Sequence, residues 1–361
     1  MFKLEPRPQP SRLMGLASPL LALGLTVLLG LGLFLLLGKD PLRGLQMFFW
    51  EPIRSLQGWS ELGLKATPLL LIALGLAVCF RANVWNIGAE GQFIVGALAA
   101  GWVAMQADAT STAGVMVPAI LAAGVLGGMA WAGITALLRA RFNANEILVS
   151  LMLVYVADLL LAYLVYGPWK DPAGFNFPQS ISFLPVTKIP RLFEGSRLNI
   201  GVLIALGSAL ACWVLLFRSY LGFSLQVGGL APAAARYAGF SSERALWTAL
   251  LLSGAMAGLA GALEVAGPLG QLTPYVPAGY GFAAIIVAFV GRLHPAGIVL
   301  SSVLMSMFYI GGELAQSRMG LPKSITGVFQ GLLLFSLLAC DTLIHYRVRR
   351  IAAPGAATPG L

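Results

Sequence analysis

Ten apolar windows recur along this chain of 361 residues, and nearly all are long enough to cross the roughly 30 Å hydrocarbon core of a bilayer. They lie near residues 13–38, 62–80, 87–106, 114–138, 146–166, 199–217, 245–267, 279–291, 295–312 and 324–344. Charged side chains make up only 10% of the residues and hydrophobic ones 58%, whereas soluble domains average about 25% charged. The sequence therefore excludes a soluble protein and predicts an all-α fold, a polytopic membrane helix bundle with about ten transmembrane segments.

Two of these windows, residues 87–106 and 279–291, are short or rich in glycine. Broken or re-entrant helices occur at membrane depth only where protein or a water-filled cavity covers the freed backbone groups. We therefore expect these two segments to be short or interrupted and to be covered by other parts of the protein.

The distribution of Lys and Arg predicts how the chain crosses the membrane, because these residues favour cytoplasmic loops. With the N-terminus inside, thirteen of the 23 basic residues fall in inside segments and ten in outside segments. We therefore expect cytoplasmic termini, residues 1–12 and 345–361, around a membrane domain of residues 13–344. The first apolar run is too long for a signal peptide and is expected to stay as an anchor. The net charge of +9 thus reflects orientation, and it does not indicate nucleic acid, because no basic face alternates with stacking aromatics.

Two outside loops are long enough to carry structure. Residues 39–65 hold an aromatic-rich helical pattern, which fits an anchor lying along the membrane interface. Residues 167–197 contain five prolines, a density that predicts an irregular, extended extracytoplasmic cap. The last stretch, residues 352–361, is a short tail of small residues and proline that we expect to be disordered.

Residue patterns needed for enzyme chemistry are missing from this sequence. His294 and His345 are the only histidines, which excludes an HExxH metal site, and neither a GxSxG elbow nor a phosphate-binding loop occurs. Cys79, Cys212 and Cys340 lie singly in apolar stretches and indicate packing rather than a disulfide or a metal site. We therefore expect no catalytic residues, no metal and no cofactor. Energy for any uphill transport then comes from an ion gradient or a separate ATPase subunit.

Three acidic residues, Glu90, Asp158 and Glu264, lie inside the apolar windows. An ionisable group at the centre of a membrane helix costs roughly 2.5–3.5 kcal/mol on insertion scales and usually faces a bundle interior or a cavity. Glu90 shares a glycine-containing stretch with Asn86 and Gln92. This pattern fits equally well a polar site or a set of hydrogen bonds that hold an unusual helix packing.

The other two acids occur in different settings. Glu264 follows Gly254, Gly258 and Gly261, a stripe of small residues that predicts a close-packed helix face. Its carboxylate is either a neutral hydrogen-bonding acid or a group that faces a cavity. Asp158 stands in a leucine-rich helix without a visible partner, and we expect it to make a packing hydrogen bond to another helix.

Residues 218–244, an expected cytoplasmic segment, carry the pattern of a short helix. Pro232 suits the first turn of this helix, and Gly239 suits its end. A short helix exposed between two membrane spans offers a surface that another protein can bind. On these residues alone, a plain cytoplasmic linker is the alternative.

The same segment resembles the coupling-helix region of permease subunits of ATP-binding-cassette (ABC) importers, in the branch that includes ribose and branched-chain amino acid permeases. The family pattern is Gly-x-Asn-Pro-x-Ala-Ala-x-x-x-Gly, and residues 229–239 read Gly-Leu-Ala-Pro-Ala-Ala-Ala-Arg-Tyr-Ala-Gly. Ala231 replaces the asparagine, so one polar cap or contact is missing. Residues 80–92, and residues 279–282 followed by 290–297, resemble the nucleoside-type permeases of that branch, often described as sugar permeases.

The resemblance implies a permease subunit that carries a nucleoside or a simple sugar across the cytoplasmic membrane of a bacterium or archaeon. It also implies a cytoplasmic double-cassette ATPase, a second homologous permease subunit and an extracytoplasmic substrate-binding lipoprotein as partners. The residues that the resemblance assigns to ATPase coupling are Gly229, Pro232, Ala235, Arg236 and Gly239. The polar residues placed near the substrate pathway are Asn86, Glu90, Gln92 and Glu264.

Two other classes of function stay open on the sequence. A proton-coupled secondary transporter of a small polar solute would use Glu90 or Glu264 as the proton carrier. Its signature is a pair of equivalent interrupted helices in inverted halves, and this sequence shows no convincing pair. A structural membrane scaffold is the third possibility.

Overall fold

Helices form most of the computed structural model, which describes residues 2–7, 12–108 and 110–350. Within these residues, eight helices are long and apolar enough to cross a membrane. They are α1 (Arg12–Leu36), α3 (Leu56–Arg81), α5 (Ala113–Phe142), α6 (Glu146–Tyr166), α7 (Gly201–Arg218), α10 (Ser242–Glu264), α12 (Pro295–Met319) and α13 (Ile325–His345). Two shorter apolar helices, α4 (Ala89–Met105) and α11 (Tyr280–Val290), occupy the windows expected to be short. The predicted all-α polytopic bundle is therefore confirmed.

Short elements fill the connections between the long helices. They are α2 (Pro41–Leu45), η1 (Gln46–Trp50), η2 (Glu51–Ile53), η3 (Pro185–Thr187), α8 (Tyr220–Leu230), α9 (Pro232–Tyr237) and η4 (Val265–Leu269). The proline-rich stretch expected to be irregular holds the single turn η3 and isolated strand bridges between Lys170 and Ser180 and between Arg191 and Asn199. It is otherwise irregular, as its proline content predicts.

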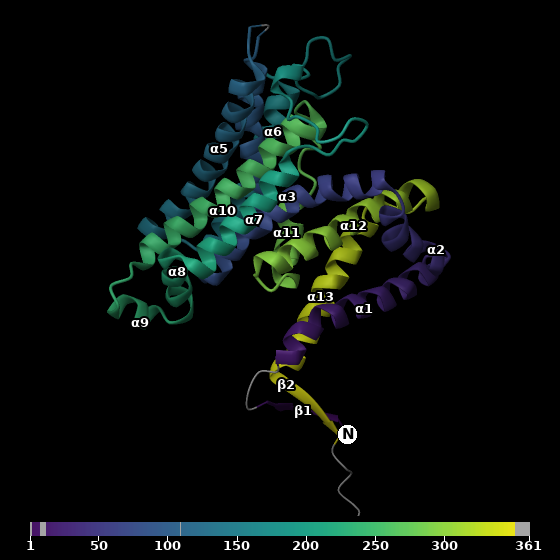
Figure 1. Ribbon diagram of the computed structural model, residues 1–361, viewed down its shortest axis with the longest axis vertical. Helices are drawn as coiled ribbons and strands as arrows, with labels where there is room; N and C mark the ends of the chain where they lie inside the picture. Colours follow the sequence, from purple (N-terminus) through teal and green to yellow (C-terminus); the bar gives the residue numbers. More distant parts are fainter. Residues whose placement is uncertain (1, 8–11, 109, 351–361) are drawn as a thin grey trace, which may run out of the picture. The chain divides into compact units, whose positions relative to one another are not determined.

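The chain divides into two compact units. The central unit runs from Glu51 to Ile310, and the terminal unit combines the chain up to Trp50 with the chain from Gly311 onward. In the terminal unit, α1 packs along α13 (Figure 1). Its core contains three phenylalanine rings whose centroids lie 4.4 to 6.1 Å apart, those of Phe34, Phe48 and Phe329.

The terminal unit also contains a strand pair that the sequence did not reveal. Strand β1 (Phe2–Pro6) pairs antiparallel with β2 (Tyr346–Arg350), in the register that sets Leu4 opposite Val348. Because α1 and α13 lie side by side, the segments that precede α1 and follow α13 meet (Figure 1). This pairing depends on contacts between the two ends of the chain, so local sequence pattern does not predict it. The tail expected to be disordered, residues 352–361, lies outside the described residues.

The aromatic-rich stretch at residues 39–65 is divided rather than continuous. Asp40 caps α2 by accepting a hydrogen bond from the N–H of Leu42 at 3.0 Å, and two short turns follow. Helix α3 then begins at Leu56, where Ser55 Oγ accepts a hydrogen bond from the N–H of Gly58 at 3.0 Å. The last ten residues of the expected loop therefore belong to a membrane-length helix.

Glycines set the packing of the central unit, where α4, α5 and α10 lie against one another. A β carbon on Gly254 of α10 would lie 2.6 Å from Cβ of Ala132, and one on Gly258 would lie 2.9 Å from Cα of Gly128. Real β carbons essentially never approach this closely, so these positions require glycine unless the helices separate. The close-packed face predicted from the small-residue stripe is confirmed.

Candidate functional site

A buried pair of amide side chains stabilises the non-helical segment between α3 and α4. Asn86 donates from Nδ2 to Oε1 of Gln92 at 3.0 Å, and Gln92 donates from Nε2 to Oδ1 of Asn86 at 3.1 Å. Asn86 also donates to Oγ of Ser253, in α10, at 3.0 Å, and its Oδ1 accepts from the N–H of Gly88 at 3.1 Å. Both amides are buried. They tie the segment before α4 to α10 through groups that are already hydrogen bonded within the protein.

Glu90, in the first turn of α4, caps the start of α11. Its buried carboxylate accepts hydrogen bonds from the backbone N–H of Gly279, at 2.9 Å, and from that of Gly281. The first N–H groups of a helix have no partner inside the helix and carry partial positive charge. Gly279, with φ of +77°, has no side chain to cap α11 itself. A β carbon on Gly281 would lie 2.6 Å from Cα of Glu90, so glycine there lets the starts of α4 and α11 meet.

Glu264 lies apart from these residues, at the far end of α10. Ser253, which contacts Asn86, is eleven residues earlier, so Glu264 is about 16 Å further along the helix at 1.5 Å per residue. Its carboxylate makes no hydrogen bond or ion pair with any residue that the structure describes. It lines a cavity of about 10 Å³, close to the volume that one water molecule needs. Lys65 and Arg197 supply the attractive charges around it.

The packing hydrogen bond expected for Asp158 is not found. The residue is exposed in the middle of α6, and its carboxylate makes no hydrogen bond with any residue in the described part of the chain. Helix α6 buries a different face, formed by Ser150, Val154, Ala157, Leu161 and Val165. An uncovered carboxylate at mid-span is costly in lipid, so this side of α6 requires protein or water around it.

The short helix predicted between Pro232 and Gly239 is present as α9. Pro232 occupies its first turn, and Gly239 follows it with φ of +83°. Ala231, at the N-cap position, makes no side-chain capping hydrogen bond, so the polar cap is missing as expected. Ala235 is buried, whereas Tyr237 is 97% exposed. One side of α9 is therefore anchored and the other is open.

A cleft of about 280 Å³ is lined by residues of α8, α9 and the start of α10. Four of the five residues predicted for ATPase coupling line it, namely Pro232, Ala235, Arg236 and Gly239. The loop after α9 is held by Phe240, whose ring packs edge-on against Tyr220 at 5.7 Å and Phe223 at 6.2 Å. The cleft thus has a fixed apolar wall and an exposed basic residue at its edge.

Gly229, the fifth predicted coupling residue, contacts the end of α3 instead. A β carbon there would lie 2.6 Å from the carbonyl oxygen of Arg81 and 3.0 Å from the backbone nitrogen of Asn83. Asn83 has φ of +56° and begins the segment that leads to Asn86. Arg81 in turn donates from Nε to the carbonyl oxygen of Leu293 at 2.8 Å. Sequence reasoning missed the contact between α8 and this turn, and an asparagine just after a helix was the available signal.

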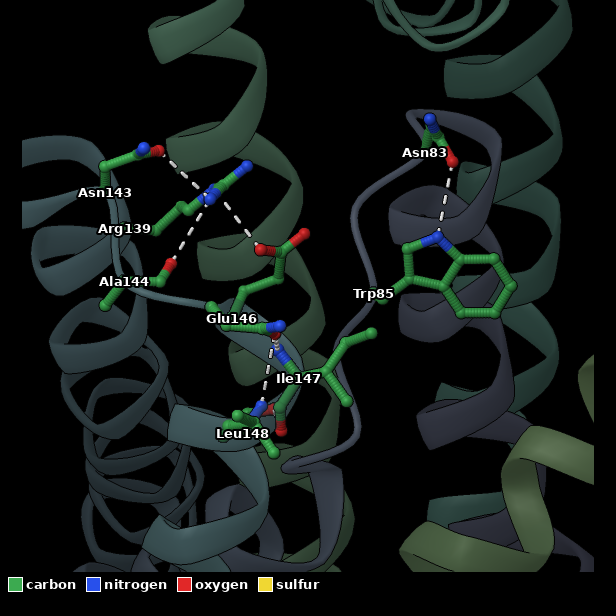
Figure 2. A network of polar contacts seen from close by, with 10 residues as sticks. Asn83, Trp85, Arg139, Asn143, Ala144, Glu146, Ile147 and Leu148 are labelled. Carbon is green, nitrogen blue, oxygen red and sulfur yellow. Dashed lines mark hydrogen bonds and ion pairs between the residues drawn. The ribbon is translucent and has the colours of Figure 1, made fainter.

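A polar hairpin joins α5 to α6 (Figure 2). Nε of Arg139 lies 3.2 Å from Oε2 of Glu146, and the same guanidinium donates to Oδ1 of Asn143 at 3.1 Å and to the carbonyl oxygen of Ala144 at 3.3 Å. Asn145 caps α6 by accepting from the N–H of the second helical residue at 2.9 Å. Sequence reasoning passed over this hairpin, although an asparagine followed by Glu146 is a helix-start pattern.

A second group of side chains was also missed. The Lys65 ammonium lies 6.0 Å from the centre of the buried Tyr280 ring, which packs against Phe93 at 5.9 Å and Tyr309 at 5.4 Å. The Lys65 ammonium also acts electrostatically on the Glu264 carboxylate. Its assignment to an outside loop hid it, because the sequence pattern did not show that α3 begins nine residues earlier.

Comparison with known proteins places these features in a family context. A family model described as "Branched-chain amino acid transport system / permease component" matches residues 60–338. The glucose ABC transporter permease protein TsgB13 of Haloferax volcanii is 32% identical, over 99% of this chain and 98% of its own length. The guanosine ABC transporter permease protein NupP of Bacillus subtilis is 30% identical, over 96% and 99%. The nucleoside ABC transporter permease protein NupB of Lactococcus lactis subsp. cremoris is 27% identical, over 88% and 89%. No solved structure matches the chain.

Proposed function

The chain belongs to the family of permease components of branched-chain amino acid transport systems, and on that premise we propose that it moves a nucleoside or a simple sugar across the cell membrane. The relatives named for glucose, guanosine and nucleosides align over most of this chain. As a permease subunit it is a transport component and not an enzyme.

The exposed α8–α9 region carries this proposal. We assign this region to the contact with a cytoplasmic double-cassette ATPase. That partner supplies the energy by hydrolysing ATP, since this sequence contains no phosphate-binding loop. The cleft, the 97% exposed Tyr237 and the exposed Arg236 form a surface that is open on one side and anchored on the other. An extracytoplasmic substrate-binding lipoprotein delivers the solute to the opposite side of the membrane.

Charge reversal at this surface tests the coupling role. In liposomes that contain the permease with its ATPase and binding subunits, Arg236→Glu is expected to lower substrate-stimulated ATP hydrolysis and uptake together. Arg141→Glu is the matched control, because Arg141 is an exposed basic residue in the last turn of another helix. Equal ATP hydrolysis in the two variants would contradict the coupling role.

Of the four residues predicted near the substrate pathway, Glu264 is the best candidate for contact with the solute. Asn86, Gln92 and Glu90 have their polar groups satisfied within the protein, so we assign them to holding the helix breaks. Glu264 has no such partner in the described part of the chain and borders a cavity. Glu264→Gln is expected to change the apparent affinity for the solute, whereas the same substitution at exposed Glu194 is expected to leave it unchanged.

The exposed carboxylate of Asp158 supports a second permease subunit as partner. A mid-span acid facing lipid costs roughly 2.5–3.5 kcal/mol on insertion scales, and contact with a second permease or with a watery path between two subunits removes that cost. Cysteine cross-linking from positions 155 and 158 in native membranes is expected to give a permease dimer. Labelling of both positions by lipid-soluble reagents alone would contradict this interface.

The solute class is decided by uptake measurements. Labelled guanosine, ribose and glucose are tested one at a time in the reconstituted system, with leucine as the comparison from the family description. Uptake that requires ATP and persists with a proton uncoupler is expected. Uptake without an ATPase that collapses with the uncoupler would favour the proton-coupled alternative instead.

A further inference from the structure

Two hollows adjoin at the end of the central unit where α3 and α7 begin and α10 ends. The larger is an apolar groove of about 570 Å³, whose lining includes Leu56, Trp59, Phe193 and Leu198. The smaller is a basic pocket of about 60 Å³, lined by Lys188, Ile189, Arg191, Arg197, Asn199, Gly267 and Pro268. Residues 191–199 contribute to both.

The strand-like pairing within residues 191–199 places basic and polar side chains at the pocket and an apolar side chain at the groove. Arg191 pairs with Asn199 across an antiparallel bridge, and the N–H of Leu192 donates to the carbonyl oxygen of Leu198 at 2.9 Å. Successive side chains of an extended chain point to opposite sides. Arg197 and Asn199 therefore share the side of the pocket, and Leu198 takes the side of the groove.

The basic pocket has donors that no acceptor in the described part of the chain uses. Asn199 is only 4% exposed, and its Oδ1 accepts from the N–H of Gly201 at 2.9 Å. Its Nδ2, next to Gly267 in the pocket wall, has no acceptor among the residues that the structure describes. The side chains of Lys188 and Arg191 likewise make no hydrogen bond or ion pair with described residues.

None of the three nearby acidic residues that the structure describes lines the basic pocket. Oε2 of Glu61 lies 3.5 Å from Nη1 of Arg197, so Glu61 partly neutralises the charge of Arg197. Glu194 lines the apolar groove rather than the pocket, and Glu264 lines the separate small cavity that shares Asn199 and Pro268 with the pocket. Two free cations and one buried amide N–H therefore remain to bind an anionic oxygen group.

We propose that the pocket and the groove together bind one phospholipid, with its phosphate in the pocket and an acyl chain along the groove. The site lies where membrane-length helices begin and end, which is the depth of lipid headgroups, and the half-exposed Trp59 beside it is typical of that level. Basic pockets between membrane helices bind lipid phosphates by charge. Free phosphate or a protein carboxylate matches the pocket alone and leaves the 570 Å³ groove without an occupant.

Lipid binding to the purified full-length chain tests this assignment. Native mass spectrometry in mixed micelles compares phosphatidylglycerol with a diacylglycerol of the same chains, and inorganic phosphate is added as a separate competitor. Phosphatidylglycerol is expected to remain bound where diacylglycerol does not. At about 1 kcal/mol per surface cation, the double variant Lys188→Gln, Arg191→Gln is expected to bind it roughly thirtyfold more weakly. The control Arg43→Gln, Lys323→Gln, two exposed cations of the terminal unit, is expected to bind normally.

A variant without a charge change separates the pocket from general electrostatics. A β carbon on Gly267 would collide with Nδ2 of Asn199, so Gly267→Ala is expected to weaken phosphatidylglycerol binding. Gly207→Ala, whose added methyl meets nothing within 4 Å, is the control for folding. Equal retention of the two lipids, equal binding by the charge variant and its control, or competition by phosphate with no lipid bound would each overturn the phospholipid site.

Discussion

Removal of the Glu90 carboxylate tests whether this residue is a helix cap or a solute contact. In Glu90→Ala, the backbone N–H groups of Gly279 and Gly281 lose their acceptor in a buried place. Each unpaired buried donor costs about 1–3 kcal/mol, so the two together cost about 2–6 kcal/mol. Glu90→Gln keeps one carbonyl oxygen and is expected to lose about half as much. The order of stability is therefore Glu, then Gln, then Ala.

Thermal unfolding of the detergent-purified chain measures this order. At about 2–4 °C per kcal/mol for domains of a few hundred residues, Glu90→Ala is expected to lower Tm by about 4 °C or more. Glu194→Ala is the control, because Glu194 is exposed in a loop and makes no hydrogen bond with described residues. An unchanged Tm in Glu90→Ala together with lost uptake would refute the cap and restore Glu90 as a solute contact.

Three smaller changes test other parts of the structure. Ala231→Asn adds the missing N-cap of α9 and is expected to stabilise that helix by about 1 kcal/mol, which slower amide hydrogen exchange across α9 measures; unchanged exchange counts against it. Gly258→Ala pushes a methyl group into the backbone of α5 and is expected to cost about 1–3 kcal/mol, seen as a lower Tm that Gly207→Ala does not show. Glu146→Gln breaks the partly exposed ion pair with Arg139 and is expected to cost only about 0.2–1 kcal/mol, so a Tm loss as large as that of Gly258→Ala would contradict this estimate.

The fold was predictable from the sequence because its main determinant is local. A run of about twenty apolar residues indicates a membrane helix, and all ten windows contain a helix, including the two short ones. The limits of helices were less predictable where polar residues fall inside them. Lys65 was assigned to a loop because its charge interrupts the apolar pattern, although α3 continues through it and its ammonium lies over the Tyr280 ring.

Polar partners were the least predictable feature, since they depend on contacts between distant segments. Asn86 and Gln92 are six residues apart, and their mutual hydrogen bonds were one of the two readings that the sequence allowed. The pairing of Glu90 with Gly279 spans 189 residues, and no local pattern indicates it. For Asp158 the expectation of a hydrogen bond rested on the cost of a bare acid in lipid, and the single chain does not include the second subunit that we propose to meet this cost.

These contacts also give the proposed coupling surface a physical connection to the interior. Gly229 lets α8 rest directly on the turn at Arg81 and Asn83, where even one added methyl group would collide with the backbone. From that turn a short segment leads to Asn86, which is hydrogen bonded to α10. It continues to Glu90, which is hydrogen bonded to the start of α11. Packed backbone transmits a displacement because it has no room to absorb it. A force that the proposed ATPase partner would apply to α8 and α9 would therefore act on α3, α4, α10 and α11 together, at the place where α4 and α11 meet.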